Sequence, residues 1–337
     1  MNNDLIILEL SATIKQLISR AREHSYTVVN TVMIETYWQI GKAIVEREQS
    51  GNLRAEYGKK LLLALSLQLS KEMGKGFSRS NLQNMRNFYL LFPKCQTASG
   101  ILSWSHYCEL LSISDQHARD FYEAEATNAK WSVKELKRQI STSLFERLLL
   151  SKGADNQQYL LQLAREGQQI QQASDLIKNP YVFEFLGVPE NKPIRELDLQ
   201  LKIVRYIENF LLEMGKGFMF VGTQQRITLD NTHYYVDMVF YNKILRSYIL
   251  IDLKMVKLDH THVGQMNMYL NYYKTEVNDE LDQDPIGIIL CTDRNEPMAE
   301  YALGGLSNQI FAAKYVLYVP DKETLIQQLK KMLDNEM

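Results

Sequence analysis

Apolar residues recur at three- and four-residue spacings through the first half of the chain, and this period predicts α-helices. Glycines, prolines and short polar runs divide the pattern, and Ser132 with Glu135 three residues later has the spacing of a capping box. The expected helices cover residues 5–22, 28–49, 55–73, 80–91, 104–111, 115–126 and 132–150. We therefore expect residues 1–150 to form a helical domain.

The next stretch, residues 151–180, is rich in Gln, Gly, Ser and Asp and closes at Pro180. This composition predicts a polar linker with some helix, and it places the domain boundary there.

Beyond residue 180 the pattern alternates between helices and strands. Helices are expected over 195–214 and 263–273, and strands over 218–229, 234–241, 247–256, 286–291 and 315–319. The strand at 286–291 is nearly all apolar, which is typical of a strand in the middle of a sheet. The order is helix, three strands, helix, strand, then a helix–strand–helix tail. It predicts a mixed α/β domain over residues 181–337.

Length and composition limit the class of protein. The chain has 337 residues, more than one hydrophobic core usually serves, so two domains are expected. Its net charge of −2 means that nucleic-acid binding would depend on local basic patches. Cys95, Cys108 and Cys291 are widely separated, which argues against a zinc site or a disulfide framework. The sequence has neither a signal peptide nor a run of about 18 apolar residues, so we expect a cytoplasmic protein without a membrane span.

Two neighbouring strands of the α/β half form a hairpin in which acidic residues face one another. Because side chains alternate along a strand, Asp252 and Lys254 share one face of the second strand. If the turn is assumed to be centred between Ile244 and Leu245, Asp237 of the first strand lies directly across from Asp252. Two facing carboxylates repel each other, and a divalent cation such as Mg²⁺ removes this conflict. The pattern therefore predicts a metal site.

Lys254 follows Asp252 by two residues, in a strand otherwise rich in Ile and Leu. Its ammonium group could contact an attacking water or a scissile phosphate, which suits metal-dependent hydrolysis of phosphodiesters. The alternative is an exposed salt bridge between the two side chains, the usual meaning of a lone Asp-x-Lys. The apolar strand and the matching acid Asp237 favour the metal site and keep both interpretations open.

The helix expected at 263–273 adds two polar side chains. Gln265 and Tyr269 are four residues apart and share one helix face, so both could reach the same phosphate or metal-bound water. Periodicity alone favours the alternative, in which Tyr269 packs on the sheet and Gln265 is solvated. His260 and His262, just before this helix, are expected to be loop residues.

In the helical half, residues 61–92 have the helix, glycine turn, helix order of a helix-turn-helix motif. The side chains suited to base edges and phosphates there include Lys75, Arg79, Asn81, Gln83 and Arg86. An ordinary helical hairpin with a polar outer face is the alternative. Trp104 and His106 further on predict a hydrogen-bonded packing cluster, because no catalytic partner stands at a recognised spacing.

Residues 195–320 resemble the PD-(D/E)XK nuclease domain of the YhcG-like family of bacterial proteins. The matching pieces are FLLEMGKGFMFVGTQQRI (210–227), YYVDMVFYN (234–242), ILIDLK (249–254), VGQMNMYLNYY (263–273) and IGIILC (286–291). The helical half is similar to that family's N-terminal domain through YWQIGKAIVEREQSG (37–51), RAEYGKKLL (54–62), GKGFSRSNLQNMRNFY (74–89), LSWSHYCELL (102–111) and WSVKELKRQI (131–140). The resemblance covers nearly the whole chain. It implies a helical, winged-helix-like domain followed by a restriction-endonuclease-like α/β domain.

The resemblance also implies roles for individual residues. Asp237 matches the first acid of the family motif, Asp252 and Lys254 match the (D/E)-x-K pair, and Gln265 with Tyr269 matches Q-x-x-x-Y. The implied metal ligands are Asp237, Asp252 and Leu253. In the first helix of the domain, Gln200 stands where relatives have Glu, and Glu196, one turn earlier, is a substitute.

These features imply an endonuclease that uses Mg²⁺ or Mn²⁺ to hydrolyse DNA in restriction, repair or defence, as a homo-oligomer or with partner proteins. Because Gln200 brings no charge, a DNA-binding or assembly subunit with weak or no catalysis stays open as the alternative. A structural subunit of a larger defence complex, docking through its helical half, is a third hypothesis.

Overall fold

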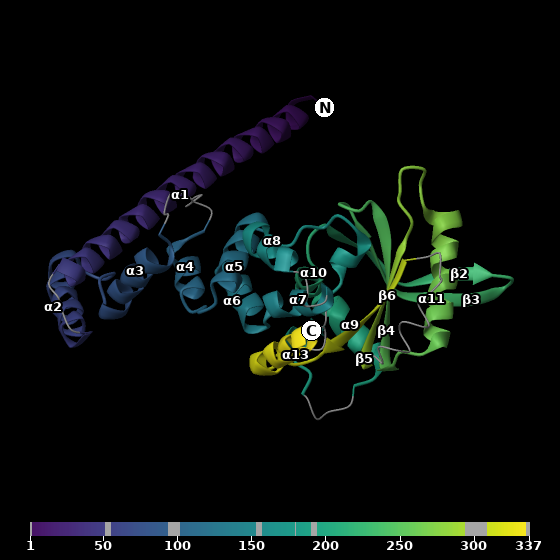
Figure 1. Cartoon of the computed structure of the whole chain (residues 1–337). Coiled ribbons are helices and arrows are strands. Elements are labelled where there is room, and N and C mark those ends of the chain that lie inside the picture. The colour runs from purple at the N-terminus through teal and green to yellow at the C-terminus, as the bar shows by residue number, and fades with distance from the viewer. Residues whose placement is uncertain are drawn as a thin grey trace. The chain divides into compact units, whose positions relative to one another are not determined.

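The computed structural model describes residues 2–50, 55–93, 102–152, 157–178, 180–189, 194–293 and 309–334 (Figure 1). The chain divides into two compact units, Met1–Lys137 and Arg138–Met337. This division differs from the expected domains 1–150 and 181–337 with a linker between them. Residues 138–180 belong to the second unit, where Leu148 and Leu176 are buried.

The first unit is helical throughout its described residues, with α1 (Asn2–Ser50), α2 (Ala55–Met73), α3 (Arg79–Leu91), α4 (Trp104–Leu110), α5 (Gln116–Asn128) and the start of α6 (Val133–Ser141). The prediction of two helices over 5–22 and 28–49 was wrong, because α1 runs through both. Residues 23–27 contain neither Gly nor Pro, so nothing ends the helix there. The described part of this unit holds no β-hairpin that could serve as the wing of a winged helix.

A glycine lets α1 and α3 approach closely. A Cβ atom at Gly41 of α1 would lie 2.0 Å from the carbonyl oxygen of Met85 in α3, far inside van der Waals contact. Around this crossing Ile44, Leu62 and Leu82 form a small buried core. Any larger residue at position 41 would therefore push the two helices apart.

The second unit is built on a six-stranded sheet in the order β1-β6-β5-β4-β3-β2. The strands are β1 (Tyr181–Val182), β2 (Phe218–Leu229), β3 (Thr232–Asn242), β4 (Ser247–Lys257), β5 (Ile286–Asp293) and β6 (Gln309–Val316). The strands β2, β3 and β4 pair antiparallel, whereas β4, β5, β6 and β1 pair parallel. The mixed α/β fold expected for this half is confirmed.

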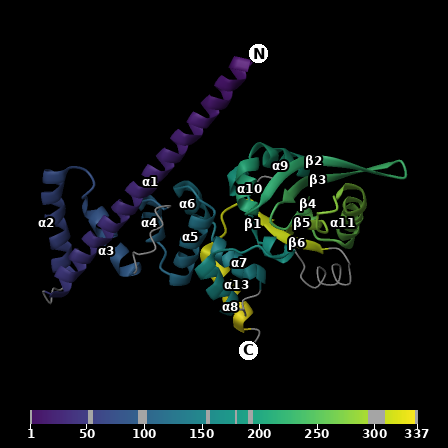
Figure 2. The same cartoon turned by 90° about the horizontal axis from the view of Figure 1, so that it is seen from above.

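Helices cover both faces of the sheet (Figure 2). On one face α9 (Glu196–Arg205) and α10 (Ile207–Met214) pack in an apolar cluster with Ile251 and Leu253 of β4. On the other face α11 (His260–Tyr272), continued by a π-helical turn (Tyr273–Val277), packs with Val239 and Leu250. The remaining elements are α7 (Leu144–Lys152), α8 (Gln157–Glu166), α13 (Lys322–Asp334) and two short 3-10 turns (Ala173–Leu176 and Glu184–Leu186). No described helix is long and apolar enough to cross a membrane.

Several predicted boundaries were wrong. The helix expected over 132–150 is split into α6 and α7, because Ser143 has a φ of 55°, outside the helical region. The helix expected over 195–214 is split into α9 and α10 at Tyr206, whose φ of −110° and ψ of 35° are not helical. The strand expected at 315–319 is β6, which ends at Val316, and the helix expected before it lies outside the described residues. The predicted cap is confirmed, since Ser132 Oγ accepts a hydrogen bond from the N–H of Glu135 at 3.2 Å.

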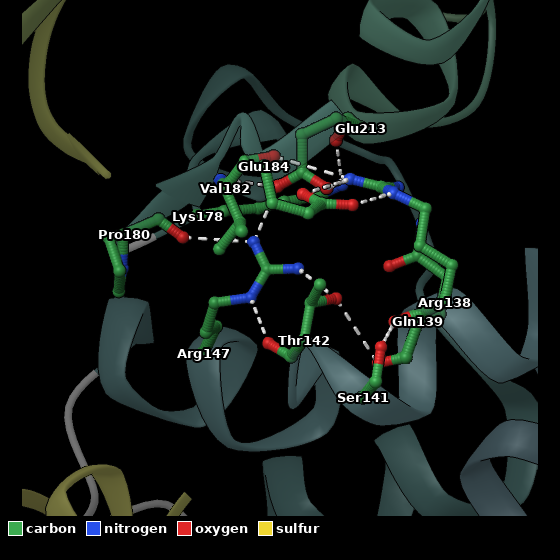
Figure 3. A network of polar contacts seen from close by, with 10 residues as sticks. All are labelled: Arg138, Gln139, Ser141, Thr142, Arg147, Lys178, Pro180, Val182, Glu184 and Glu213. Atoms are coloured by element: carbon green, nitrogen blue, oxygen red, sulfur yellow. Dashed lines mark hydrogen bonds and ion pairs between the residues drawn. The ribbon is translucent and has the colours of Figure 1, made fainter. Parts of the chain in front are cut away.

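A buried glutamate ties the segment that precedes the sheet to α10 (Figure 3). The Glu213 carboxylate accepts hydrogen bonds from Arg147, from Arg138 at 3.1 Å and from the N–H of Val182 at 3.0 Å. Lys178 donates to the main-chain oxygen of the same residue. Burial alone would raise the pKa of Glu213, but the three cations outweigh burial and lower it to about 2. The network therefore holds Arg138, Arg147, Lys178 and Val182 against α10.

Replacing Glu213 by Gln is expected to destabilise the second unit by about 3–5 kcal/mol, because cations inside the unit lose their counter-charge. Since the folded pKa is lowered, the stability that Glu213 contributes is present above about pH 4.5 and is lost as the pH falls toward about 2. Chemical denaturation at several pH values measures this, and Glu208→Gln, an exposed position on the same helix, is the control. A Glu213→Gln protein within about 1 kcal/mol of wild type at pH 7 would contradict this account.

Candidate active site

The hairpin of β3 and β4 brings two acidic residues face to face. Met238 of β3 pairs with Ile251 of β4, so the turn is centred between residues 244 and 245, and the predicted register is confirmed. Continued by one residue beyond the last pair, this register puts Asp237 opposite Asp252, and the two carboxyl groups interact. Both side chains are nearly buried, with an exposed fraction of 7% for Asp237 and 1% for Asp252.

The two strands separate at these residues. The main-chain pairing of β3 with β4 ends at Met238 and Ile251, and the N–H of Leu253 donates instead to Asp237 Oδ2 at 2.9 Å. β4 continues along β5, with which Lys254 still pairs. A side-chain carboxylate thus replaces a main-chain acceptor, and this bond fixes Asp237 beside the Asp-x-Lys segment.

Asp252 and Lys254 form an ion pair within the site, not the exposed salt bridge of the alternative interpretation. Lys254 Nζ lies 2.9 Å from Asp252 Oδ2 and 4.0 Å from Glu196 Oε1. Burial raises the pKa of Asp252 to about 7; the Asp237 carboxylate adds to the rise, and Lys254 opposes it. Burial would lower the pKa of Lys254, yet the neighbouring carboxylates outweigh burial and raise it. Near neutral pH, Asp252 can therefore gain or lose its proton while Lys254 stays charged.

From α11, Gln265 and Tyr269 reach toward the same part of the sheet. The Gln265 amide donates to the Tyr269 hydroxyl, which donates in turn to the main-chain oxygen of Tyr235 at 3.1 Å. Tyr269 is fully buried in the apolar cluster, and Gln265 is half-buried. Burial raises the pKa of the Tyr269 hydroxyl, and Asp252 contributes to the rise. The structure thus combines the two interpretations: Tyr269 packs on the sheet and also places its hydroxyl near the acids.

The first helix of the α/β fold, α9, contributes Gln200 and Glu196. Gln200 is nearly buried, and its Oε1 accepts a hydrogen bond at 2.9 Å from Gln224, whose amide also donates to Asp237 Oδ1 at 3.2 Å. Glu196 Oε1 lies 4.0 Å from Lys254 Nζ, and burial raises the pKa of Glu196 although Lys254 opposes the rise. Sequence reasoning missed Gln224, because a glutamine in an alternating strand pattern carries no signal of an inward contact.

The residues predicted to contact DNA belong to the first unit. Arg86 is held by Glu48 of α1 at 2.7 Å, and Asn81 accepts a hydrogen bond from the Trp104 indole at 2.8 Å. These two side chains therefore connect helices of the unit. Of the other three, Lys75 lies in the turn before α3, and Arg79 and Gln83 lie on α3. Lys75 and Arg79 are exposed, and Gln83 is half-buried.

The histidines serve packing and capping. His106 contacts Ser103 Oγ at 2.8 Å and the main-chain oxygen of Trp131 at 3.0 Å, so the predicted packing cluster is confirmed. The prediction that His260 and His262 are loop residues was wrong, because both lie in the first turn of α11. Asp259 is the N-cap of this helix, and its N–H donates to His262 Nδ1 at 3.2 Å.

The side chains of the site suit a divalent cation that takes few protein ligands. In the part of the chain that the structure describes, no group of three or more His, Cys, Asp or Glu is placed to hold a metal ion. Asp237 and Asp252 still offer two facing carboxylates, and the buried Asp252 Oδ2 has the Lys254 ammonium 2.9 Å away. Mg²⁺ commonly binds through one or two carboxylates, water and substrate phosphate. Among the described cysteines, neither Cys108 nor Cys291 forms a disulfide, and Cys95 lies outside the described residues.

Replacing Asp252 by Asn is expected to stabilise the metal-free protein at pH 8 by about 2–4 kcal/mol, because a buried charge is removed. The pKa of Asp252 is raised in the folded state, so the folded protein binds the proton more tightly, and wild-type stability rises as the pH falls from about 7 toward 4. The advantage of Asp252→Asn should therefore shrink at pH 5. Thermal unfolding in EDTA measures this, with the exposed Asp230→Asn as control. A loss of stability in Asp252→Asn at pH 8 would contradict the description of this site.

Comparison with known proteins confirms the family resemblance. The YhcG PDDEXK nuclease domain matches residues 174–334, and the DUF1016 N-terminal domain matches residues 13–147. The protein of Escherichia coli (strain K12) named "Putative nuclease YhcG" is 37% identical over an alignment of 347 positions, gaps included, and the alignment covers 93% of this chain and 91% of that protein. The similarity to a solved structure, a repair endonuclease from Pyrococcus abyssi, covers 39% of this chain and 50% of that protein's chain, at 18% identity and with a TM-score of only 0.27. The chain therefore belongs to the YhcG family, with a DUF1016 N-terminal domain followed by a PDDEXK nuclease domain.

Proposed function

We propose that this protein is a DNA endonuclease that depends on Mg²⁺ or Mn²⁺, with its active site where β3 and β4 separate. The observation that carries the proposal is the facing pair of Asp237 and Asp252, buried in a sheet of mainly apolar side chains. Such a pair destabilises a sheet unless a proton or a cation neutralises it. Membership of a nuclease family supports hydrolysis as the use of that cation. We assign the activity to restriction, repair or defence.

In this proposal Asp237 and Asp252 hold the metal ion, together with the main-chain oxygen of Leu253. When bound, the cation lowers the pKa of a water molecule and offsets charge on the phosphate. Lys254, charged beside Asp252, orients that water or neutralises charge that develops on the phosphate. The hydroxyl of Tyr269, held by Gln265, adds a polar group from α11.

A second candidate function, DNA binding or assembly with little catalysis, rests on Gln200. This neutral side chain stands where the family motif has Glu, and Gln224 already occupies its oxygen. A weaker metal site follows if Glu196 does not replace the missing charge. Tight DNA binding without cleavage of any DNA form would favour this candidate.

The purified protein is expected to cut DNA with Mg²⁺ or Mn²⁺ and to stop when EDTA is added. Lys254→Ala should slow cleavage by about 100-fold or more, as is common when a group that stabilises transition-state charge is lost. The assay covers single-stranded, duplex and branched DNA, and thermal unfolding shows that each variant is folded. Lys257→Ala, at the exposed end of the same strand, is the matched control and should cut at a near wild-type rate. Cleavage that survives both Asp237→Ala and Lys254→Ala would contradict the assignment of the site.

The proposal includes a role for the first unit in DNA binding and in assembly. Lys75 and Arg79 are exposed on the helical hairpin and are the proposed contacts to DNA phosphates. An apolar stripe on α1 supports a homo-oligomer: Leu10, Leu17 and Val28 are exposed by 57%, 60% and 47%. Leu17 and Val28 lie eleven residues apart, a period that keeps a stripe on one side of a nearly straight helix. Two copies of this helix could bury their stripes against each other.

The double variant Leu17→Glu/Val28→Glu is expected to convert an oligomer into a monomer, since it places charges in the paired stripe. Size-exclusion chromatography with light scattering measures the mass, against 39.2 kDa for a single chain. Gln16→Glu, exposed next to the stripe, is the control. A wild-type mass of one chain would contradict the homo-oligomer and favour a partner protein as the occupant of the stripe.

A further inference from the structure

Gln224 has a backbone conformation that is unusual for a strand residue. It lies in β2, at the edge of the sheet, and its neighbours Thr223 and Gln225 pair with β3 on either side of Asp237. The φ of Gln224 is +49°, in the left-handed region that residues other than glycine rarely adopt. The chain therefore leaves regular strand geometry opposite the first acid of the candidate active site.

From this backbone an exposed residue reaches inward to two nearly buried groups. The Gln224 amide donates to Gln200 Oε1 at 2.9 Å and to Asp237 Oδ1 at 3.2 Å. The other oxygen of Asp237 accepts the N–H of Leu253 at 2.9 Å. Both oxygens of the carboxylate are thus held by a donor, one from each neighbouring strand. The Asp237 side chain is fixed in a single orientation as a result.

A glutamine at this position suits the hydrogen bonds that its side chain makes, but it does not suit the left-handed backbone conformation. Gly and Asn adopt a left-handed backbone at lower cost than Gln. Gly has no side-chain amide, however, and the side chain of Asn is one methylene group shorter than that of Gln. Gln224 therefore has a strained backbone, but its side chain is long enough to bridge Gln200 and Asp237.

We propose that Gln224 is a positioning residue that holds Asp237 in the orientation that binds the metal ion. This role rests on the proposed metal site at Asp237 and Asp252. Without the bridge, Asp237 can turn away from Asp252, because the two carboxylates repel each other. Loss of a hydrogen bond that supports a metal ligand typically weakens metal affinity by about 10–100-fold.

The test measures Mn²⁺ binding to the full chain by calorimetry, without DNA and without turnover. Gln224→Ala and Gln224→Gly are each expected to weaken binding by about 10-fold. The matched control is Gln225→Ala, because the amide of this neighbouring glutamine donates to the main-chain oxygen of Thr223 at 3.3 Å and not to the acids. Its affinity should stay close to that of wild type, well short of the roughly 10-fold loss expected when a supporting contact is removed.

Thermal unfolding of the metal-free proteins gives a second readout with the opposite sign. Gln224→Gly relieves the strained φ, so its melting temperature should equal or exceed that of Gln224→Ala, although both bind Mn²⁺ equally weakly. A purely structural residue would not separate affinity from stability in this way. Unchanged Mn²⁺ affinity in Gln224→Gly would overturn the positioning role while leaving the metal site intact. A wild-type chain that binds no Mn²⁺ would instead contradict the proposed metal site, and with it this role.

Discussion

Two carboxylates, Asp237 and Asp252, face each other across β3 and β4 inside the sheet, and the surrounding groups respond to that conflict. The two strands separate at these residues. The main-chain N–H of Leu253 and the side-chain amide of Gln224 donate hydrogen bonds to the two oxygens of Asp237, and Lys254 forms an ion pair with Asp252. With Glu196 beside Lys254, three carboxylates and one ammonium leave a charge of −2 when all are ionised. A divalent cation supplies the charge that the protein lacks, and a proton on Asp252 replaces part of it near neutral pH.

The same unit contains a buried acid with the opposite environment. Glu213 is surrounded by Arg138, Arg147 and Lys178, and its pKa falls to about 2, whereas burial raises the pKa of Asp252 to about 7. The negative charge of Glu213 is neutralised by cations of the chain itself, and the ion pairs hold their elements against α10. The charge of Asp252 is compensated only in part, which is the condition expected of a group that must meet a ligand. Charge balance thus distinguishes a structural acid from a candidate catalytic one.

The hairpin could be predicted from the sequence, because side chains alternate along each strand. The facing acids followed once the turn was assumed to be centred between Ile244 and Leu245, an assumption that the observed register confirms. The mixed α/β order followed from periodicity in the same way. The helix breaks at Ser143 and Tyr206 could not be predicted, because neither residue is Gly or Pro and only the backbone angles show the break. Conversely, the break expected at residues 23–27 does not occur, because α1 continues through them. Gln224 was missed for the same reason, since neither its positive φ nor its contacts leave a trace in the pattern of polar and apolar residues. Arg86 and Asn81 were predicted as DNA contacts on residue type, but they bond within the first unit.

The central claim is that a divalent cation belongs between Asp237 and Asp252. Anomalous diffraction from crystals soaked in Mn²⁺ tests it most directly, because the signal locates the metal without reference to activity. The account predicts one anomalous peak in contact with carboxylate oxygens of both residues, at about 2.1–2.3 Å, between the distances typical of Mg²⁺ and of Ca²⁺ to oxygen ligands. Crystals whose anomalous peak lies away from both carboxylates, or that show none in the second unit, would contradict it.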